Sequence, residues 1–111
     1  MEKYVFILDL ETVLNQMDLI QNCPVLKNVI IFQTIFEELN VRKPAAYNTL
    51  KNLIEVDTYR KFYIFPNEFF EATYTPIQSN ENQEERNERA VLKAALYYKD
   101  HLKVSNIKNL H

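Results

Sequence analysis

The stretch Y-V-F-I-L-D-L-E-T, residues 4–12, carries the pattern that decides the fold. Residues 4–8 are apolar without alternation, which is typical of a strand buried on both faces of a parallel sheet. Asp9 follows this run directly. A carboxylate at the end of a buried strand costs free energy unless it is paired, hydrogen-bonded or bound to a metal ion. The stretch therefore predicts a parallel sheet and a specific role for Asp9.

Two further short apolar runs, at 28–32 and 61–65, predict strands of the same kind. Apolar side chains at helical spacing predict helices, with Thr12 and Thr34 as N-caps of the first two, over residues 12–20, 35–39, 44–54 and 84–102. Strands that alternate with helices indicate an α/β domain with a small parallel sheet flanked by helices. We expect this domain to span residues 1–102, with residues 103–111 as a C-terminal tail.

Composition excludes several classes of function. The 111 residues contain 13 Lys+Arg against 15 Asp+Glu, so the net charge of -2 argues against a polyanion binder that acts through bulk charge. A local basic patch is compatible with that charge. The absence of glycine excludes Gly-rich phosphate loops and dinucleotide fingerprints. The single Cys23 fits a reducing compartment, and no apolar run reaches the ~20 residues of a membrane span. We therefore expect a soluble protein of the nucleus or cytoplasm.

Carboxylates gather where such a sheet would carry its site. In parallel α/β sheets the reactive crevice lies at the carboxyl ends of the strands. The acidic residues predicted at or just beyond those ends are Asp9, Glu37, Glu38, Glu84, Glu85 and Glu88. Clustered carboxylates favour a hard divalent cation such as Mg²⁺ or Mn²⁺. Structural roles compete with this interpretation: an N-cap for Asp9, a solvated surface for Glu37 and Glu38, and the helix dipole for the other three.

Five segments together resemble one known family: residues 7–20 (ILDLETVLNQMDLI), 28–42, 45–53, 60–74 and 82–102. They are similar to the PIN nuclease domain of the eukaryotic RNA exosome's catalytic subunit, a ribonuclease II-like exoribonuclease. The resemblance implies a PIN fold in which four acidic side chains bind two Mn²⁺ or Mg²⁺ ions and cleave single-stranded RNA. By position, three of these acids are Asp9 in I-L-D, Glu38 in F-E-E and Glu88 in N-E-R, where the family has Asp.

The chain departs from the family pattern around the expected metal site. Leu10 and Glu11 replace the usual Thr-Asn, and Glu88 is one methylene longer than Asp. The fourth acid follows a further strand that would lie beyond residue 102, and we expect this chain to lack the C-terminal strands of the full fold. Glu11, Glu85 or a partner chain would then have to supply the fourth ligand. Strand 4–8 would become an exposed edge that another molecule covers, so a free monomer is not expected.

These departures favour a degenerate PIN module that acts as a binding or structural component of a ribonucleoprotein, either the exosome core or the ribosome. In this hypothesis the endonuclease activity has been lost. RNA phosphates or acidic protein surfaces would contact six basic residues: Arg42, Lys43, Arg60, Lys61, Arg86 and Arg89. The alternative is an active Mn²⁺- or Mg²⁺-dependent endoribonuclease. A third hypothesis treats the chain as a fragment of a longer exosome ribonuclease.

Overall fold

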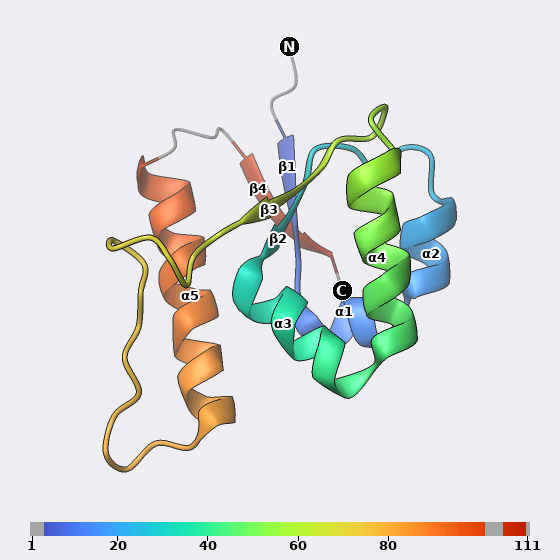
Figure 1. The fold of residues 1–111 in the computed structure, drawn as a ribbon. Helices are drawn as coiled ribbons and strands as arrows, with labels where there is room; N and C mark the ends of the chain where they lie inside the picture. The colour runs from blue at the N-terminus through green and yellow to red at the C-terminus, as the bar shows by residue number, and fades with distance from the viewer. Residues whose placement is uncertain (1–3, 102–105, 111) are drawn as a thin grey trace.

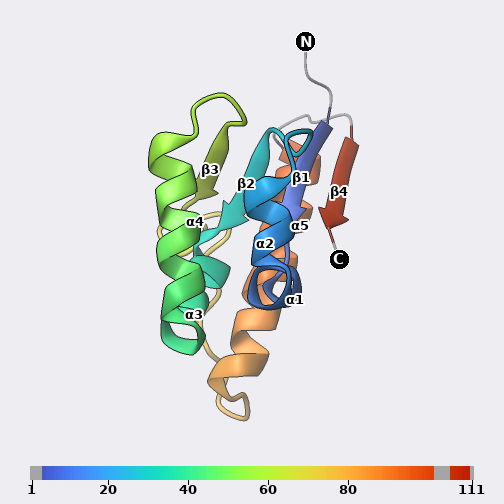
Figure 2. The same cartoon turned by 90° about the vertical axis from the view of Figure 1, so that its right-hand side faces the viewer.

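The computed structural model describes residues 4–101 and 106–110, which form one α/β unit (Figure 1). Its elements are β1 (Tyr4–Leu8), α1 (Leu10–Asn15), α2 (Met17–Asn22), β2 (Val29–Phe32), α3 (Gln33–Arg42), α4 (Pro44–Val56), β3 (Phe62–Phe65), α5 (Gln83–His101) and β4 (Asn106–Leu110). The strands lie in the order β3-β2-β1-β4, and every neighbouring pair is parallel. Helices α2 and α4 lie on one side of this sheet and α5 on the other (Figures 1 and 2). None of the described helices has the length and apolar character needed to cross a bilayer.

The predicted α/β class, with a small parallel sheet flanked by helices, is confirmed. β1 occupies residues 4–8 as expected, and β2 and β3 each begin one residue later than their apolar runs. Register places Phe6 opposite Val29 and Ile7 opposite Ile30. Because neighbouring strands are parallel, their carboxyl ends lie at one edge of the sheet, where α1 and α3 begin.

The expectation that no strand follows residue 102 is wrong. β4 pairs with β1 along its whole length, from Tyr4 opposite Asn106 to Leu8 opposite Leu110 (Figure 2). β1 is therefore an inner strand between β2 and β4, and the exposed edge predicted at residues 4–8 does not exist. The run N-I-K-N-L has too few apolar residues to predict a strand from the sequence pattern. It pairs through main-chain hydrogen bonds, which require no apolar side chains. The predicted boundary between residues 102 and 103 lies outside the described residues.

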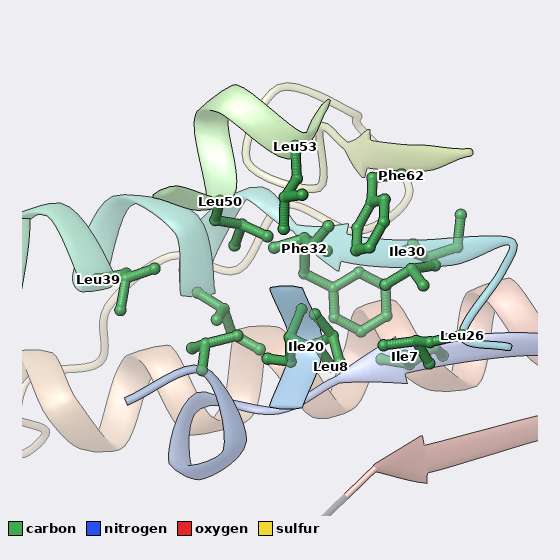
Figure 3. Close-up of a cluster of buried hydrophobic side chains, with 14 of the residues drawn as sticks. Ile7, Leu8, Ile20, Leu26, Ile30, Phe32, Leu39, Leu50, Leu53 and Phe62 are labelled. Atoms are coloured by element: carbon green, nitrogen blue, oxygen red, sulfur yellow. The ribbon is translucent and has the colours of Figure 1, made fainter. Parts of the chain in front are cut away.

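The core lies between the sheet and its helices. Leu8, Ile31 and Phe32 from the inner strands are completely buried. Figure 3 shows Leu50 and Leu53 of α4 reaching toward Phe32. Full burial of one such side chain stabilises the fold by about 1.5–3 kcal/mol. The continuous apolar runs of β1 and β2 thus reflect strands covered on both faces.

Several helix boundaries differ from the sequence prediction. The single helix expected over 12–20 is interrupted at Gln16, whose backbone (φ -131°, ψ 36°) ends α1 before α2 begins. The first helix starts at Leu10, so Asp9 rather than Thr12 is its N-cap. Helix α3 follows β2 without a break, which places Thr34 inside the helix instead of at its cap.

The chain makes its left-handed turns without glycine. Asn28 (φ 56°) and Lys61 (φ 62°) adopt this conformation immediately before β2 and β3. Asn tolerates the left-handed region, whereas for Lys it costs on the order of 1–2 kcal/mol. The two turns are held side by side, since the Asn28 N–H donates to the Arg60 carbonyl at 2.7 Å and the Val29 N–H to the Lys61 carbonyl at 3.0 Å.

Candidate functional site

The three acids singled out in the sequence line one cavity at the carboxyl end of the sheet. Asp9 follows β1, Glu38 lies on α3 and Glu88 lies on α5. The cavity has a volume of about 410 Å³ and is lined by Asp9, Leu10, Glu11, Ile35, Glu38, Arg42, Glu84, Asn87, Glu88 and Val91. The fold therefore brings together carboxylates from three separate elements, as the parallel topology predicts.

Asp9 has a structural task at the start of α1. Its Oδ1 accepts a hydrogen bond from the Thr12 N–H at 2.9 Å, and its extended backbone (φ -92°, ψ 170°) is typical of an N-cap. The side chain thus satisfies one of the amide groups that a helix leaves unpaired at its first turn. The capping role raised from the sequence is present, and it explains why a carboxylate is stable at the end of a buried strand.

Glu38 is also engaged by neighbouring side chains. Its Oε2 lies 3.5 Å from Nη1 of Arg42 one helical turn later, and its Oε1 accepts a hydrogen bond from Nδ2 of Asn87 at 3.3 Å. Asn87 reaches it from α5, so this contact joins the two helices that border the cavity. Arg42 places a positive charge beside the Glu38 carboxylate. The sequence singled out neither Asn87 nor its link to Glu38.

The remaining acidic candidates divide between the cavity and the helix start. Glu11, Glu84 and Glu88 are exposed and line the cavity. Glu85 forms a reciprocal cap with Asn82: its N–H donates to Asn82 Oδ1 at 2.8 Å, while the Asn82 N–H donates to Glu85 Oε1 at 3.0 Å. Glu85 therefore caps the N-terminus of α5. Glu11, in contrast, lines the cavity together with the three predicted metal ligands.

The metal ions implied by the family resemblance require closely converging ligands. Throughout residues 4–101, no three side chains of the His, Cys, Asp or Glu type are placed so that they could hold an ion together. Asp9 is turned toward the α1 amides and Glu38 toward Arg42, so the carboxylates share a cavity without forming a coordination shell. As placed, these residues do not fit a metal centre.

Two of the six basic candidates are buried within the fold. Arg60 donates from Nε to Asp57 Oδ2 at 2.7 Å and from its Nη atoms to three carbonyls at the end of α2, those of Ile20, Gln21 and Cys23. Arg60 is only 6% exposed and Arg86 only 7%. The structure gives their guanidinium groups partners inside the protein, which is a different role from an RNA or protein contact.

Arg86 forms an ion pair beneath a second hollow. Its Nη1 and Nη2 lie 2.7 and 2.5 Å from the two carboxylate oxygens of Glu68, and its Nε donates to the Thr75 carbonyl at 2.8 Å. The Thr34 hydroxyl also donates to Glu68. Hydrogen bonding to Arg86 lowers the pKa of Glu68, and burial opposes that shift only in part. Glu68 was not among the sequence candidates, although it lies in the loop that follows β3.

The hollow above this ion pair has a volume of about 600 Å³ and adjoins the carboxylate cavity. Glu38, Arg42, Glu84 and Asn87 line both spaces. The other lining residues are Thr34, Glu37, Val41, Glu68, Tyr74, Ile77, Gln83 and Arg86. Acidic side chains outnumber basic ones around both spaces, so an anionic ligand would meet repulsion there.

The other basic candidates are accessible to different degrees. Arg42, Lys43 and Lys61 are exposed. Lys43 Nζ donates to the Leu14 carbonyl at 2.7 Å, which ties the start of α4 to α1. Arg89 is partly buried and donates hydrogen bonds to the Glu81 carboxylate from Nε at 2.5 Å and from Nη2 at 2.7 Å. This contact lowers the pKa of Glu81 to about 2. Arg42, Lys43 and Lys61 therefore form the accessible part of the predicted basic set.

Comparison with known proteins gives consistent matches. A family model described as "PIN domain" matches residues 6–109. The chain is 33% identical over 101 residues to the human "Exosome complex exonuclease RRP44", covering 91% of this chain and 10% of the relative. It is 37% identical over 81 residues to "Exosome complex exonuclease dis3" of Schizosaccharomyces pombe, covering 73% of this chain and 8% of the relative. The chain thus spans about a tenth of the length of these curated relatives.

A solved structure shows the same fold. The PIN domain of T. brucei RRP44 superimposes with a TM-score of 0.81 at 23% sequence identity. The match covers 96% of this chain and 75% of the other. At that identity the superposition shows the fold alone.

Proposed function

The chain belongs to the PIN domain family, and from that premise we propose that it acts as a binding or structural component of an RNA-processing particle, its endonuclease activity lost. The relatives named above are exosome exonucleases, which supports the exosome core as the host particle. The alternative host particle is the ribosome. In either case we expect the protein in the nucleus or cytoplasm, close to RNA.

The observation that carries this proposal is the use made of the cavity carboxylates. Asp9 caps α1, and Glu38 is held by Arg42 and Asn87. Oδ1 of Asp9 and both carboxylate oxygens of Glu38 already have partners, so a cation would have to share these oxygens or displace the groups bound to them. Catalysis by metal ions requires ligands held within about 0.5 Å of their working positions. Ligands that already serve the fold in other ways are poorly suited to that demand.

The alternative, an active divalent-metal-dependent endoribonuclease, is favoured by one specific observation. Asp9, Glu38 and Glu88 line the same cavity, with Glu11 and Glu84 beside them. This set contains enough oxygen ligands for Mg²⁺ or Mn²⁺ if the side chains rearrange on binding. The two hypotheses therefore make opposite predictions about metal affinity and RNA cleavage.

The first experiment measures Mn²⁺-dependent cleavage of a circular single-stranded RNA, together with Mn²⁺ binding by calorimetry. The variants are Asp9→Asn, which keeps a side-chain oxygen for the cap, and Glu38→Gln. We expect no cleavage by the unmodified chain. Cleavage that disappears in Asp9→Asn would overturn the proposal, whereas cleavage that survives both substitutions would come from a contaminant.

The second experiment identifies the host particle and the contacts. A tagged chain is purified from cells and its partners are compared with those of the double variant Arg42→Glu/Lys61→Glu. Both residues are exposed, so the fold is expected to tolerate the change. We expect exosome core proteins with the unmodified chain and a weaker association with the variant. Recovery of ribosomal subunits instead would assign the chain to the other host.

A further inference from the structure

Away from the carboxylate cavity, the outer edge of β3 lies beside an aromatic groove. The sheet order leaves β3 with β2 as its one strand neighbour within residues 4–101 and 106–110. Figure 2 shows β3 at the opposite end of the sheet from β4. An unpaired strand edge presents main-chain donors and acceptors that another extended segment can satisfy. We propose that this edge and the groove form a docking site for an extended, apolar segment of a partner protein.

The groove begins where β3 ends. Its volume is about 570 Å³, and it is lined by Gln33, Phe36, Glu37, Asn40, Val41, Tyr47, Ile64, Pro66 and Phe69. Phe36 and Tyr47 pack with ring centroids 4.6 Å apart, which gives the groove an aromatic wall between α3 and α4. Phe69, in the segment that follows β3, is 84% exposed. An exposed aromatic ring next to an apolar hollow is typical of an interaction surface.

Gln33 supplies a polar group that needs a donor. Its Nε2 donates to Glu37 Oε2 at 2.8 Å, which fixes the orientation of the amide, because the reverse orientation would set two oxygens together. Its Oε1 is then buried and, among the described residues, has no hydrogen-bond partner. A buried carbonyl oxygen without a donor costs about 1–3 kcal/mol. Because this oxygen is buried, a peptide N–H can satisfy it only if binding turns the Gln33 side chain outward into the groove.

The chemistry of the groove selects its occupant. Glu37 is the charged residue in the lining given above, and it is negative, so nucleic acid phosphates are disfavoured there. An extended peptide can pair its main chain with β3 and place an apolar side chain against Phe36 and Phe69. Recognition through main-chain pairing and one anchoring side chain suits a short strand such as Phe62–Phe65.

A second copy of the chain fits less well. If two β3 edges paired antiparallel, the start of one strand would lie next to the groove of the other. The residues at that start are Arg60 and Lys61. Arg60 is buried and bonded to the end of α2, and Lys61 offers an ammonium group rather than an apolar side chain. The site is also separate from the carboxylate cavity, since Asp9, Glu38 and Glu88 do not line the groove.

The test begins with a phage-displayed library of random short peptides selected on the immobilised chain. Enriched sequences are synthesised, and their affinities are measured with and without N-methyl groups on alternate peptide nitrogens. We expect enriched peptides rich in β-branched and aromatic residues, weakened at least about tenfold by N-methylation because it blocks strand pairing. Amide exchange at residues 62–65 should slow when the peptide is bound.

Two chain variants provide the controls. Phe69→Ala should weaken binding at least about fivefold, because it removes an exposed aromatic anchor. Tyr59→Ala removes a ring that is 71% exposed but does not line the groove, and it should leave binding unchanged. Absence of enrichment, or peptides indifferent to both N-methylation and Phe69→Ala, would overturn the proposal. Self-association of the chain that Phe69→Ala abolishes would overturn it in favour of a second copy.

Discussion

Arg60 and Arg86 carry positive charge inside the fold, and each is matched by acceptors from distant parts of the chain. Arg60 binds three carbonyls at the end of α2, where the helix dipole favours a cation. Arg86 joins α5 to Glu68 in the loop after β3. Both arginines therefore connect segments that no regular element holds together.

Substitution of Arg86 should be strongly destabilising. Arg86→Met leaves the Glu68 carboxylate without its cation, and the two side chains are only 9% and 14% exposed. Breaking a buried ion pair from one side lowers the free energy of unfolding by about 3–5 kcal/mol. The exposed Arg42→Met should change it by at most about 0.5 kcal/mol. Urea unfolding measures both, and equal losses would show that the Glu68 pair is not specially important.

Stability should fall in acid because of carboxylates whose pKa is lowered by arginine. Arg89 lowers the pKa of Glu81 from 4.5 to about 2, and Arg86 lowers that of Glu68. The folded state then binds fewer protons than the unfolded state, so this stabilisation is present above pH 4.5, the unfolded pKa, and is lost as pH falls toward about 2.

Thermal melts across this acid range test the assignment. Glu81→Gln should make the decline in melting temperature with falling pH less steep. Glu71→Gln, at an exposed position, serves as the matched control and should leave the slope unchanged. The same slope in both variants would contradict the role given to the Arg89 pair.

At the scale of elements, the need to cap helix N-termini explains why several carboxylates stand at positions where they could also bind a metal ion. Asp9 caps α1, and Glu85 with Asn82 caps α5. Both helices begin at the carboxyl edge of the sheet, so capping and metal binding compete for the same side chains. This competition is why clustered acids in the sequence do not by themselves establish a metal centre.

The Asp9 cap gives a stability prediction that is independent of RNA or metal. Asp9→Ala should lower the free energy of unfolding by about 1 kcal/mol, because an amide of α1 loses its acceptor. Asp9→Asn should retain most of the stability, since Asn is an equally good N-cap. Chemical denaturation of the three proteins decides the point. A gain in stability for Asp9→Ala would contradict the capping role, because it would mean that the Asp9 carboxylate destabilises the folded chain.

At the scale of the whole molecule, β4 forms one outer strand of the sheet and covers the edge of β1. It pairs with β1 over five positions, so the apolar strand β1 has a neighbour on both sides. The four-strand order leaves β3 and β4 as the outer strands. Each is short, which limits uncontrolled pairing with other molecules.

Removal of residues 103–111 should expose the edge of β1. Loss of the β1–β4 hydrogen bonds, each worth about 0.5–1.5 kcal/mol, should reduce stability by a few kcal/mol. The shortened chain should also aggregate, because an apolar strand then presents an open edge. Light scattering and urea unfolding, compared with the full chain, test both effects. A soluble shortened chain of unchanged stability would contradict the importance of β4.

Sequence patterns predicted the parts of this protein that depend on local chemistry. The apolar runs predicted β1, β2 and β3 within one residue, and the helical stripe predicted α5 within one residue at each end. The position of Asp9 after β1 predicted a carboxylate at the carboxyl edge of the sheet, and Asp9 lines the cavity found there. Patterns of this kind are visible because burial imposes a period on the sequence.

Partners distant in sequence were decided by tertiary structure alone. Pattern did not reveal β4, because main-chain pairing with β1 requires no apolar period in N-I-K-N-L. Nor did it reveal that Arg86 meets Glu68, or that Asn87 and Arg42 hold Glu38. The sequence by itself determined the strands, the helices and the edge where the acids gather. Tertiary structure decided which charges face one another, because a charge finds its partner by proximity in space and carries no mark of it in the sequence.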